Sequence, residues 1–331
     1  MVNYPLLDLR WAGHSAAAMS TSSATPSALD SRAIGVMTLL CLVWSLQQIS
    51  LKAVAPQASP MLMVALRSLL ALALLAVLMR RHREGLVRGR WAPGAVVGAL
   101  FGLEYLLVSE ALRLTHASHV VVFLYTAPIF AALGLRSRLP QERLAGVQWA
   151  GIALAFGGIA LAFLGGAGVA SGGALAGDAL ALLAGAAWGA TTVTIRCSSL
   201  ASAPATETLV YQLLGAAVLL LPALALTGQW RFEPAAQVWG HLAFQGVVVS
   251  FASFLTWCWL LRRYPASQLG VFSFLTPLFG VLLGVWLLGE ALRPAFIAGS
   301  GLVLAGIALV SSHAGLSRRW VALRRLQQPA G

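Results

Sequence analysis

The sequence predicts an all-α integral membrane protein with ten transmembrane helices, arranged as two inverted five-helix repeats. Three observations predict this architecture. Of the 331 residues, 59% are hydrophobic and only 10% are charged, which would leave a water-soluble domain with a very large exposed apolar surface. The apolar residues fall into ten runs, most of them about 20 residues long, the length that crosses a bilayer as a helix. One stretch of the first half also recurs in the second half.

The recurring stretch joins residues 111–135 to residues 260–284 at a constant offset of 149. Nine of the 25 aligned positions are identical, more than apolar composition alone would give, so the chain contains two copies of one unit. Each copy is an apolar segment, a short basic turn and a second apolar segment with a proline inside it. These prolines, Pro128 and Pro277, occupy matching positions and are expected to kink their helices, because proline removes a helical hydrogen bond.

The chain begins with a polar, serine-rich segment at residues 1–32. It lacks the apolar core of a secretory signal, so the sequence predicts a disordered cytoplasmic tail, in which Met19 is a second candidate for the translation start.

The first repeat is predicted at residues 33–164 and contains five apolar runs. They are expected to be helices, because a backbone exposed to lipid must satisfy its own hydrogen bonds and the runs lack the alternation of a membrane β-barrel. These helices are predicted at residues 33–51, 60–79, 92–112, 118–135 and 145–164.

A glycine-rich linker is predicted at residues 165–174, between the fifth and sixth helices. The second repeat, residues 175–312, contains helices predicted at residues 175–195, 206–227, 236–261, 266–288 and 292–312. Residues 313–331 form a basic tail that is expected to be cytoplasmic.

Positive charge predicts the orientation. With a cytoplasmic N-terminus, 17 Lys and Arg residues fall in cytoplasmic segments and 4 in outer loops, as the positive-inside rule requires. Both termini are therefore expected in the cytoplasm of a bacterium, with the chain in the inner (plasma) membrane and the linker in the periplasm. Because each half has an odd number of helices, the second half enters the membrane inverted. Transporters with inverted repeats open one central site to alternate sides of the membrane.

Three segments carry a resemblance to a known family. They are LVWSLQQ at residues 42–48, LTHASHVVVFLYTAPIFAAL at residues 114–133 and YPASQLGVFSFLTPLFGVLLGVWLLGEAL at residues 264–292. Together they resemble the EamA-type branch of the drug/metabolite transporter superfamily, and the chain is most similar to its YddG-like aromatic amino acid exporters. The first half departs from the pattern, with Gln141 where the second half has Glu290. The resemblance implies ten helices around a cavity for small metabolites or amphiphilic compounds.

The first helix of each half suggests which residues line such a cavity. Trp44 matches Trp188 at an offset of 144, and each is followed at i+3 and i+4 by polar residues. An indole beside amides or hydroxyls suits a ligand with an aromatic part and a hydrogen-bonding part. The alternative is that tryptophans pack and the polar groups bond across helices. These polar residues are Gln47 and Gln48 in the first half, and Thr191 and Thr192 in the second.

Charged residues inside the predicted helices are a second signal, because such charges are costly in a membrane and usually functional. Arg67 could form a structural ion pair with Glu104 or with Glu110, or these groups could couple transport to protons; the sequence leaves both hypotheses open. The other residues predicted to bind substrate are Tyr105, Ser109, Tyr125, Gln268 and Phe272.

Other site classes lack a matching motif. His116 and His119 have no carboxylate or cysteine nearby in sequence. We therefore expect them to form a solvated interfacial pair, and we expect no metal or cofactor site. The chain has no Gly-x-Gly-Asp, His-Glu-x-x-His or P-loop motif, which argues against an intramembrane enzyme, the third hypothesis. The sequence thus favours a monomeric secondary transporter that exports amino acids, including aromatic ones, through the lipid bilayer without binding nucleic acid. Efflux of drugs or cationic compounds by the same fold is the alternative.

Overall fold

The computed structural model describes residues 31–138, 146–164, 172–263, 273, 275–292, 294–306 and 308–309. Within these ranges the chain is helical and contains no strand, only one isolated β-bridge between Ala58 and Phe232. The all-α prediction is therefore confirmed for the described part. Residues 1–30, 165–171 and 311–331, which make up most of the predicted tails and linker, lie outside it.

The first half contains helices α1 to α6. Their bounds are α1 Ser31–Val54, α2 Pro60–His82, α3 Trp91–Leu114, α4 Ala117–Leu124, α5 Ala127–Arg138 and α6 Gly146–Leu164. A short 3-10 helix, η1 at Arg88–Arg90, leads into α3.

The second half begins with α7 at Gly172, so the last three residues of the predicted linker are helical. Its elements are α7 Gly172–Arg196, the 3-10 helix η2 Ser199–Ser202, α8 Ala205–Thr227, α9 Ala236–Ala243, the π-helix η3 Phe244–Ser253, α10 Phe254–Arg263 and α12 Leu275–Leu288. A further apolar helix spans Pro294–Gly306.

Seven helical segments of the described chain are long and apolar enough to cross a membrane. Three shorter apolar helices, Trp149–Ile159, Leu275–Leu288 and Pro294–Gly306, fall within the predicted fifth, ninth and tenth helices. The described chain is thus that of a multi-pass membrane protein, and the count of ten crossings stays a prediction.

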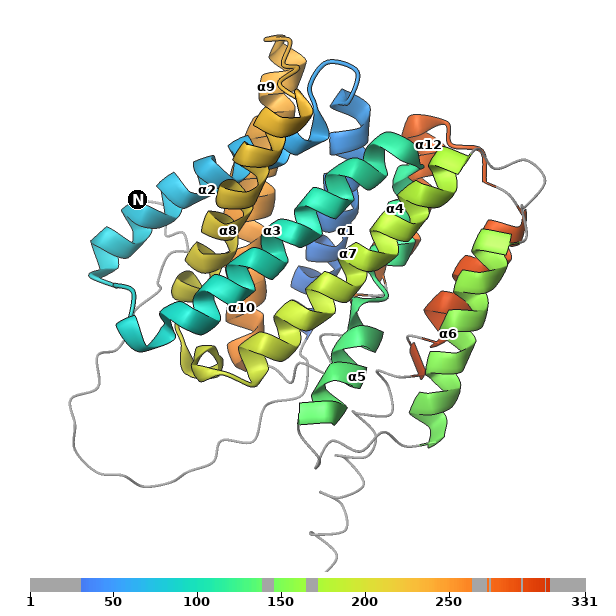
Figure 1. Cartoon of the computed structure of the whole chain (residues 1–331), viewed down its shortest axis with the longest axis horizontal. Coiled ribbons are helices and arrows are strands. Elements are labelled where there is room, and N and C mark those ends of the chain that lie inside the picture. The colour runs from blue at the N-terminus through green and yellow to red at the C-terminus, as the bar shows by residue number, and fades with distance from the viewer. Residues whose placement is uncertain are drawn as a thin grey trace, which may run out of the picture.

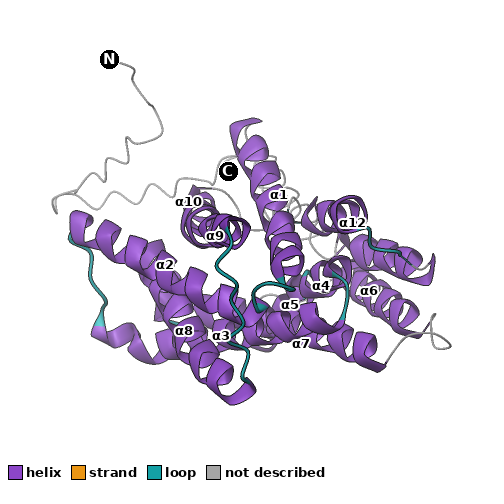
Figure 2. Ribbon diagram, turned by 90° about the horizontal axis from the view of Figure 1, so that it is seen from above, coloured by secondary structure: helices purple, strands orange, loops and turns teal. Residues whose placement is uncertain are grey.

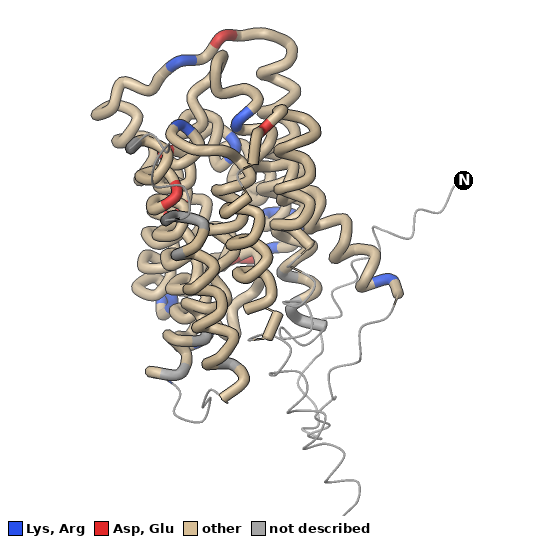
Figure 3. Tube along the Cα trace, turned by 90° about the vertical axis from the view of Figure 1, so that its right-hand side faces the viewer, with Lys and Arg blue, Asp and Glu red and all other residues tan. Residues whose placement is uncertain are grey.

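Contacts between helix ends fix the direction in which each helix runs. Lys52, near the end of α1, bonds to the end of α3, and Thr115 just beyond α3 bonds to Asp178 near the start of α7. These ends therefore share one side of the bundle, which we call the Lys52 end and which is at the top of Figure 1. Figure 3 shows several charged residues at this end. At the opposite end, Arg90 before α3 pairs with Glu207 at the start of α8.

Helix packing follows a regular scheme. α1 packs against α12 and η3, α2 against η3 and α8, α3 against α7 and α8, and α7 against α4 and α5. Seen from above, α2, α8 and α3 lie on one side of the bundle, with α6 and α12 on the other (Figure 2).

Two predicted helices are interrupted. The run predicted at residues 118–135 is divided into α4 and α5 by a turn at Tyr125 and Thr126. Pro128 is the second residue of α5, where its missing N–H is not needed, so the expected kink is a complete break. Pro277 is the third residue of α12, and the segment before Leu275 lies largely outside the described residues.

The run predicted at residues 236–261 contains the π-helix η3, which a hydropathy pattern does not distinguish from an α-helix. π-helical turns are rare and occur mostly at functional sites, because the wider turn changes which side chains face a neighbour. Here Gln245 and Ser253 of η3 both bond to side chains of the first half.

Glycines let α3 and α8 cross at backbone contact. A Cβ built on Gly98 would lie 2.5 Å from the carbonyl oxygen of Tyr211, and one built on Gly215 would collide with the backbone of Gly98. Small residues at such crossings let helices pack in lipid, where no hydrophobic force holds them together.

We therefore expect Gly215→Ala to destabilise the protein by about 1–3 kcal/mol, the usual cost of overpacking. Gly35→Ala is the control, because a Cβ at Gly35 would meet nothing within 4 Å. Thermal unfolding of both variants in detergent measures the difference. Equal melting temperatures would show that α3 and α8 can separate without cost.

Candidate functional site

A cavity of about 110 Å³ lies in the middle of the bundle, between α1, α3, the α4–α5 turn, α7, α8 and α10. Among the described residues, seven of the twelve that line it are aromatic and four carry amide or carboxyl groups. The lining residues are Trp44, Gln47, Gln48, Phe101, Glu104, Tyr105, Leu124, Tyr125, Trp188, Gln212, Phe254 and Trp257. Such a mixture of apolar walls and a few polar groups is typical of small-molecule sites.

Aromatic contacts hold the walls of the pocket in place. Trp44 donates from Nε1 to Ser253 Oγ at 3.0 Å, and its ring meets that of Trp257 edge-on at 5.4 Å. Tyr125 and Trp188 form a second edge-on pair at 5.1 Å. The two tryptophans predicted from the repeat therefore both line one pocket, each fixed by an aromatic neighbour.

Seven predicted site residues line this pocket. They are Trp44, Gln47, Gln48, Glu104, Tyr105, Tyr125 and Trp188. The sequence analysis did not select Phe101, Gln212, Phe254 or Trp257, because no repeat or charge distinguishes these residues within their helices.

Three predicted hydroxyl groups are satisfied within their own helices. Ser109, Thr191 and Thr192 donate to the carbonyl oxygens of Tyr105, Ala187 and Trp188, four residues earlier, and none lines the pocket. A hydroxyl in an apolar helix gains this bond without a partner elsewhere, so spacing alone does not show that it binds a ligand. Gln268 and Phe272 lie outside the described residues.

Arg67 is buried to 99%, and its partners differ from the two expected carboxylates. Its Nη1 donates to Gln245 Oε1 at 2.6 Å, and its guanidinium lies 4.4 Å from the ring centre of Tyr105. In the described part of the chain no ion pair joins it to either Glu104 or Glu110. Glu110 lies at the Lys52 end, where it bonds to Arg113 and to Gln229.

A chain of hydrogen bonds leads from this arginine to the pocket. Gln245 Nε2 donates to the carbonyl oxygen of Gln47 at 2.8 Å, and Gln47 Nε2 donates to the Tyr105 hydroxyl at 3.4 Å. The buried cation thus helps to hold Gln47 and Tyr105 in the pocket wall. The only sequence signal for Gln245 was an amide within an otherwise apolar run.

Two acceptor oxygens of the pocket are buried without a partner among the described residues, Oε2 of Glu104 and Oε1 of Gln48. Their residues are only 4% and 2% exposed. Buried polar atoms are normally hydrogen-bonded, so each such exception requires an explanation.

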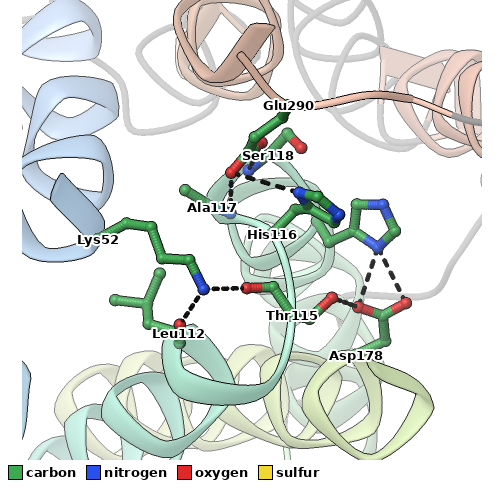
Figure 4. Close-up of polar contacts among 9 residues, drawn as sticks. Lys52, Leu112, Thr115, His116, Ala117, Ser118, Asp178 and Glu290 are labelled. Atoms are coloured by element: carbon green, nitrogen blue, oxygen red, sulfur yellow. Dashed lines mark hydrogen bonds and ion pairs between the residues drawn. The ribbon is translucent and has the colours of Figure 1, made fainter. Parts of the chain in front are cut away.

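A second group of polar side chains closes the Lys52 end. We call it the Lys52 cluster; Figure 4 shows its contacts, and its members are Lys52, Thr115, His116, His119, Asp178 and Glu290. Lys52 Nζ donates to the carbonyl oxygens of Leu112 and Thr115, and Thr115 Oγ1 donates to Asp178 Oδ1 at 2.6 Å. α1, α3 and α7 are joined in this way.

The two histidines belong to this cluster. The His116 side chain is 45% exposed, as the prediction of a solvated pair requires, but that of His119 is only 14% exposed. His119 Nδ1 lies 3.0 Å from both carboxylate oxygens of Asp178, and its ring stacks on Phe296 at 3.7 Å. His116 Nδ1 lies 3.8 Å from Glu290 Oε1. No group of three metal-ligating side chains is found among the described residues.

Glu290 caps the N-terminus of α4. It accepts from the backbone N–H groups of Ala117 at 2.6 Å and Ser118 at 3.1 Å, two of the donors that the first turn of a helix leaves free. Burial alone would raise the pKa of Glu290, but the nearby His116 and Ser118 side chains and the two backbone N–H groups outweigh it and lower the pKa to about 2. A carboxylate of the second half thus stabilises a helix of the first.

The fold and the two sites define a helical membrane protein with an aromatic, partly polar pocket at its centre. The model of the EamA-like transporter family matches the chain twice, over residues 31–164 and 175–312. The chain therefore belongs to the EamA-like transporter family. This membership points to a membrane transporter of small molecules rather than an enzyme.

Relatives agree with this assignment. An uncharacterized protein of Pseudomonas aeruginosa is 31% identical over 251 residues, which are 74% of this chain and 82% of that protein. The permease-like protein YdzE of Bacillus subtilis is 45% identical over 65 residues, 20% of this chain and 83% of its own length. An uncharacterized transporter of Archaeoglobus fulgidus is 39% identical over 71 residues, 22% of this chain, and the match spans only 26% of that protein.

A solved crystal structure supports the fold. It has a TM-score of 0.62 and 22% sequence identity, and the superposition covers 90% of this chain and 99% of the other. At this identity the likeness concerns the fold alone.

Glu290→Ala should lower stability by about 0.5–2 kcal/mol, the usual effect of removing a helix cap. Because the folded pKa lies below the ordinary value, this stabilisation is present at neutral pH and is lost as the pH falls toward 2. Glu233→Ala is the matched control, since Glu233 pairs only with the exposed Arg231 on the surface. Equal melting temperatures for the two variants at pH 7 would contradict the capping role.

Arg67→Ala should reduce the yield of folded protein, because it leaves Gln245 Oε1 buried without its donor, at a cost of about 1–3 kcal/mol. Arg231→Ala removes an arginine whose side chain is 63% exposed and should have no effect. Size-exclusion chromatography of both variants in detergent gives the comparison. Normal yield and normal melting of Arg67→Ala would show that this buried arginine is dispensable.

Proposed function

We propose that this protein is a secondary transporter that exports small amphiphilic metabolites, above all amino acids including aromatic ones, by alternating access to the central pocket. The pocket itself carries the proposal. Its aromatic walls fit an apolar group, and its amide and carboxyl groups fit a polar one.

The directions of the helices support an inverted repeat. α1 ends at the Lys52 end and α7 begins there, so these matching first helices run in opposite directions. The second helices, α2 and α8, are also opposed. Ser59 before α2 and Arg231 after α8 share a backbone hydrogen bond at the Lys52 end, and Glu207 at the start of α8 lies at the other end.

The packing contacts support the same symmetry. α1 packs on α12 as α7 packs on α4 and α5, and α2 packs on η3 as α8 packs on α3. Each of these contacts joins the two halves, and exchanging the halves turns one contact of each pair into the other. Two equivalent halves around one site can exchange their roles, which is the physical basis of alternating access.

The exposure of the lining residues indicates which end of the pocket is closed. Gln47 and Gln48, on the side of the Lys52 end, are 3% and 2% exposed. Trp188, Gln212 and Trp257, which lie in the halves of their helices away from that end, are partly exposed. The Lys52 cluster closes its end in this conformation, and we propose that its contacts break when the pocket opens there.

Charge gives the proposed orientation. The 17 to 4 distribution of Lys and Arg supports an orientation with both termini in the cytoplasm and the Lys52 end on the periplasmic side of a bacterial inner membrane. The conformation with an intact Lys52 cluster would then be closed to the periplasm. We propose that the protein works as a monomer, because the pocket is formed within one chain.

Glu104 favours a second candidate function, the efflux of cationic compounds by the same fold. It is the one carboxylate among the described lining residues, and its Oε2 has no partner there. Counterflow in proteoliposomes, with labelled amino acids and labelled amines as two panels, tests both functions. Exchange of neither panel would contradict the proposal.

We expect Trp44→Ala and Trp188→Ala to reduce the counterflow of aromatic substrates about tenfold, the effect of losing about 1.4 kcal/mol of aromatic contact. Small aliphatic substrates should be affected less. Trp286→Ala is the matched control, because Trp286 is a membrane-helix tryptophan that is 79% exposed. Equal losses for aromatic and aliphatic substrates would identify Trp44 and Trp188 as packing residues only.

A further inference from the structure

Two hydrogen-bond acceptors of the pocket have no donor among the described residues. Glu104 Oε2 and Gln48 Oε1 are buried acceptors without a donor in the described part of the chain. Trp44 Nε1 is committed to Ser253, and Gln47 Nε2 to Tyr105. A ligand that satisfies the two free oxygens must bring N–H or O–H donors with it.

The described lining of the pocket carries one charged side chain. It is Glu104, and no lysine, arginine or histidine is among these lining residues. Arg67 is outside the lining, with Nη1 bonded to Gln245 and its guanidinium against Tyr105. A carboxylate in this pocket would find no cation in contact with it, whereas an ammonium would find a carboxylate.

The aromatic walls favour a cation as well. Phe101, Trp44 and Trp188 line the same cavity as Glu104, and the faces of such rings attract positive charge. The cavity has a volume of about 110 Å³. A protein cavity of about 150 Å³ binds benzene, so a ligand with one small ring has a suitable size.

We infer that the substrates of this pocket are recognised through a protonated amine bound by Glu104 and Gln48, with an attached aromatic or apolar group among the rings. A carboxylate on the substrate is not recognised. Aromatic amines therefore bind at least as well as the amino acids of the same side chain. This inference rests on the proposed function, because it assumes that the central pocket is the substrate site.

Four probes of similar size separate the possibilities. They are phenethylamine, phenylalanine, 2-phenylethanol and 3-phenylpropionate, which present a cation, a zwitterion, a neutral group and an anion. Binding to the purified, full-length protein in nanodiscs is measured at neutral pH by quenching of tryptophan fluorescence. We expect phenethylamine to bind as tightly as phenylalanine or more tightly, and at least about tenfold more tightly than 2-phenylethanol, as a charge-assisted hydrogen bond implies. 3-Phenylpropionate should bind most weakly.

Glu104→Gln removes the charge but keeps the shape, and it should abolish the preference for phenethylamine over 2-phenylethanol. Glu110→Gln is the matched control: Glu110 lies on the same helix, outside the pocket, and its loss should leave the preference unchanged. Thermal unfolding of both variants checks that they fold. If Glu104→Gln does not fold, the ranking of the four probes on the unaltered protein still decides.

The outcomes are distinct. Binding of 3-phenylpropionate as tight as that of phenethylamine, or a preference that survives in folded Glu104→Gln, overturns the inference and leaves the transport proposal standing. If none of the four probes binds to the unaltered protein, the pocket is not a site for aromatic compounds. The proposed function then fails together with the inference.

Discussion

The structure depends on one constraint: inside a bilayer, a polar group must find its hydrogen-bond partner within the protein, because there is no water to supply one. Several buried hydroxyls meet this requirement locally. Ser68, Ser109 and Thr191 all donate to the carbonyl four residues earlier in the same helix. Such groups add little information about function.

The informative groups are those that reach across the bundle. Arg67 bonds to Gln245, Gln245 to the backbone of Gln47, and Trp44 to Ser253, and each of these bonds joins the first half to the second. They surround the central pocket, where acceptor oxygens of Glu104 and Gln48 have no partner in the described chain. These bonds between the two halves hold the walls of the pocket in place.

The same constraint shapes the Lys52 end. Four N–H groups at the start of α4 have no partner in their own helix, and Glu290 of the other half accepts from two residues there. Asp178 and Lys52 satisfy the end of α3 and the loop beyond it. These bonds join helices that must separate if the pocket opens at this end. Side-chain hydrogen bonds are suited to such a contact, since water can replace them when the helices separate.

The sequence was informative where the physics is local. Hydropathy placed α1, α2, α3, α7 and α8 within about three residues, because a membrane-spanning segment must be continuously apolar. The repeat identified Trp44 and Trp188, which line one pocket although they are 144 residues apart. Arg67 was recognised as exceptional because a buried charge is costly wherever its partner lies.

The sequence was uninformative where partners are distant. His119 and Asp178 are 59 residues apart, and Glu290 and Ala117 are 173 apart, so neither contact has a sequence spacing that reveals it. An ion pair of Arg67 with a glutamate was one of two hypotheses, yet a neutral amide and an aromatic ring contact this arginine. Thr191 and Thr192 had the spacing of site residues, but a helix offers every hydroxyl a carbonyl four residues earlier.

An experimental structure of the protein with bound phenethylamine is the most direct test of the central claim. We predict that the ligand nitrogen lies at about 2.7–2.9 Å, a charge-assisted hydrogen-bond distance, from Glu104 Oε2. Its ring should lie between Trp44 and Trp188. A ligand bound elsewhere, or one whose nitrogen points away from Glu104, would contradict recognition of the substrate through its amine in the central pocket.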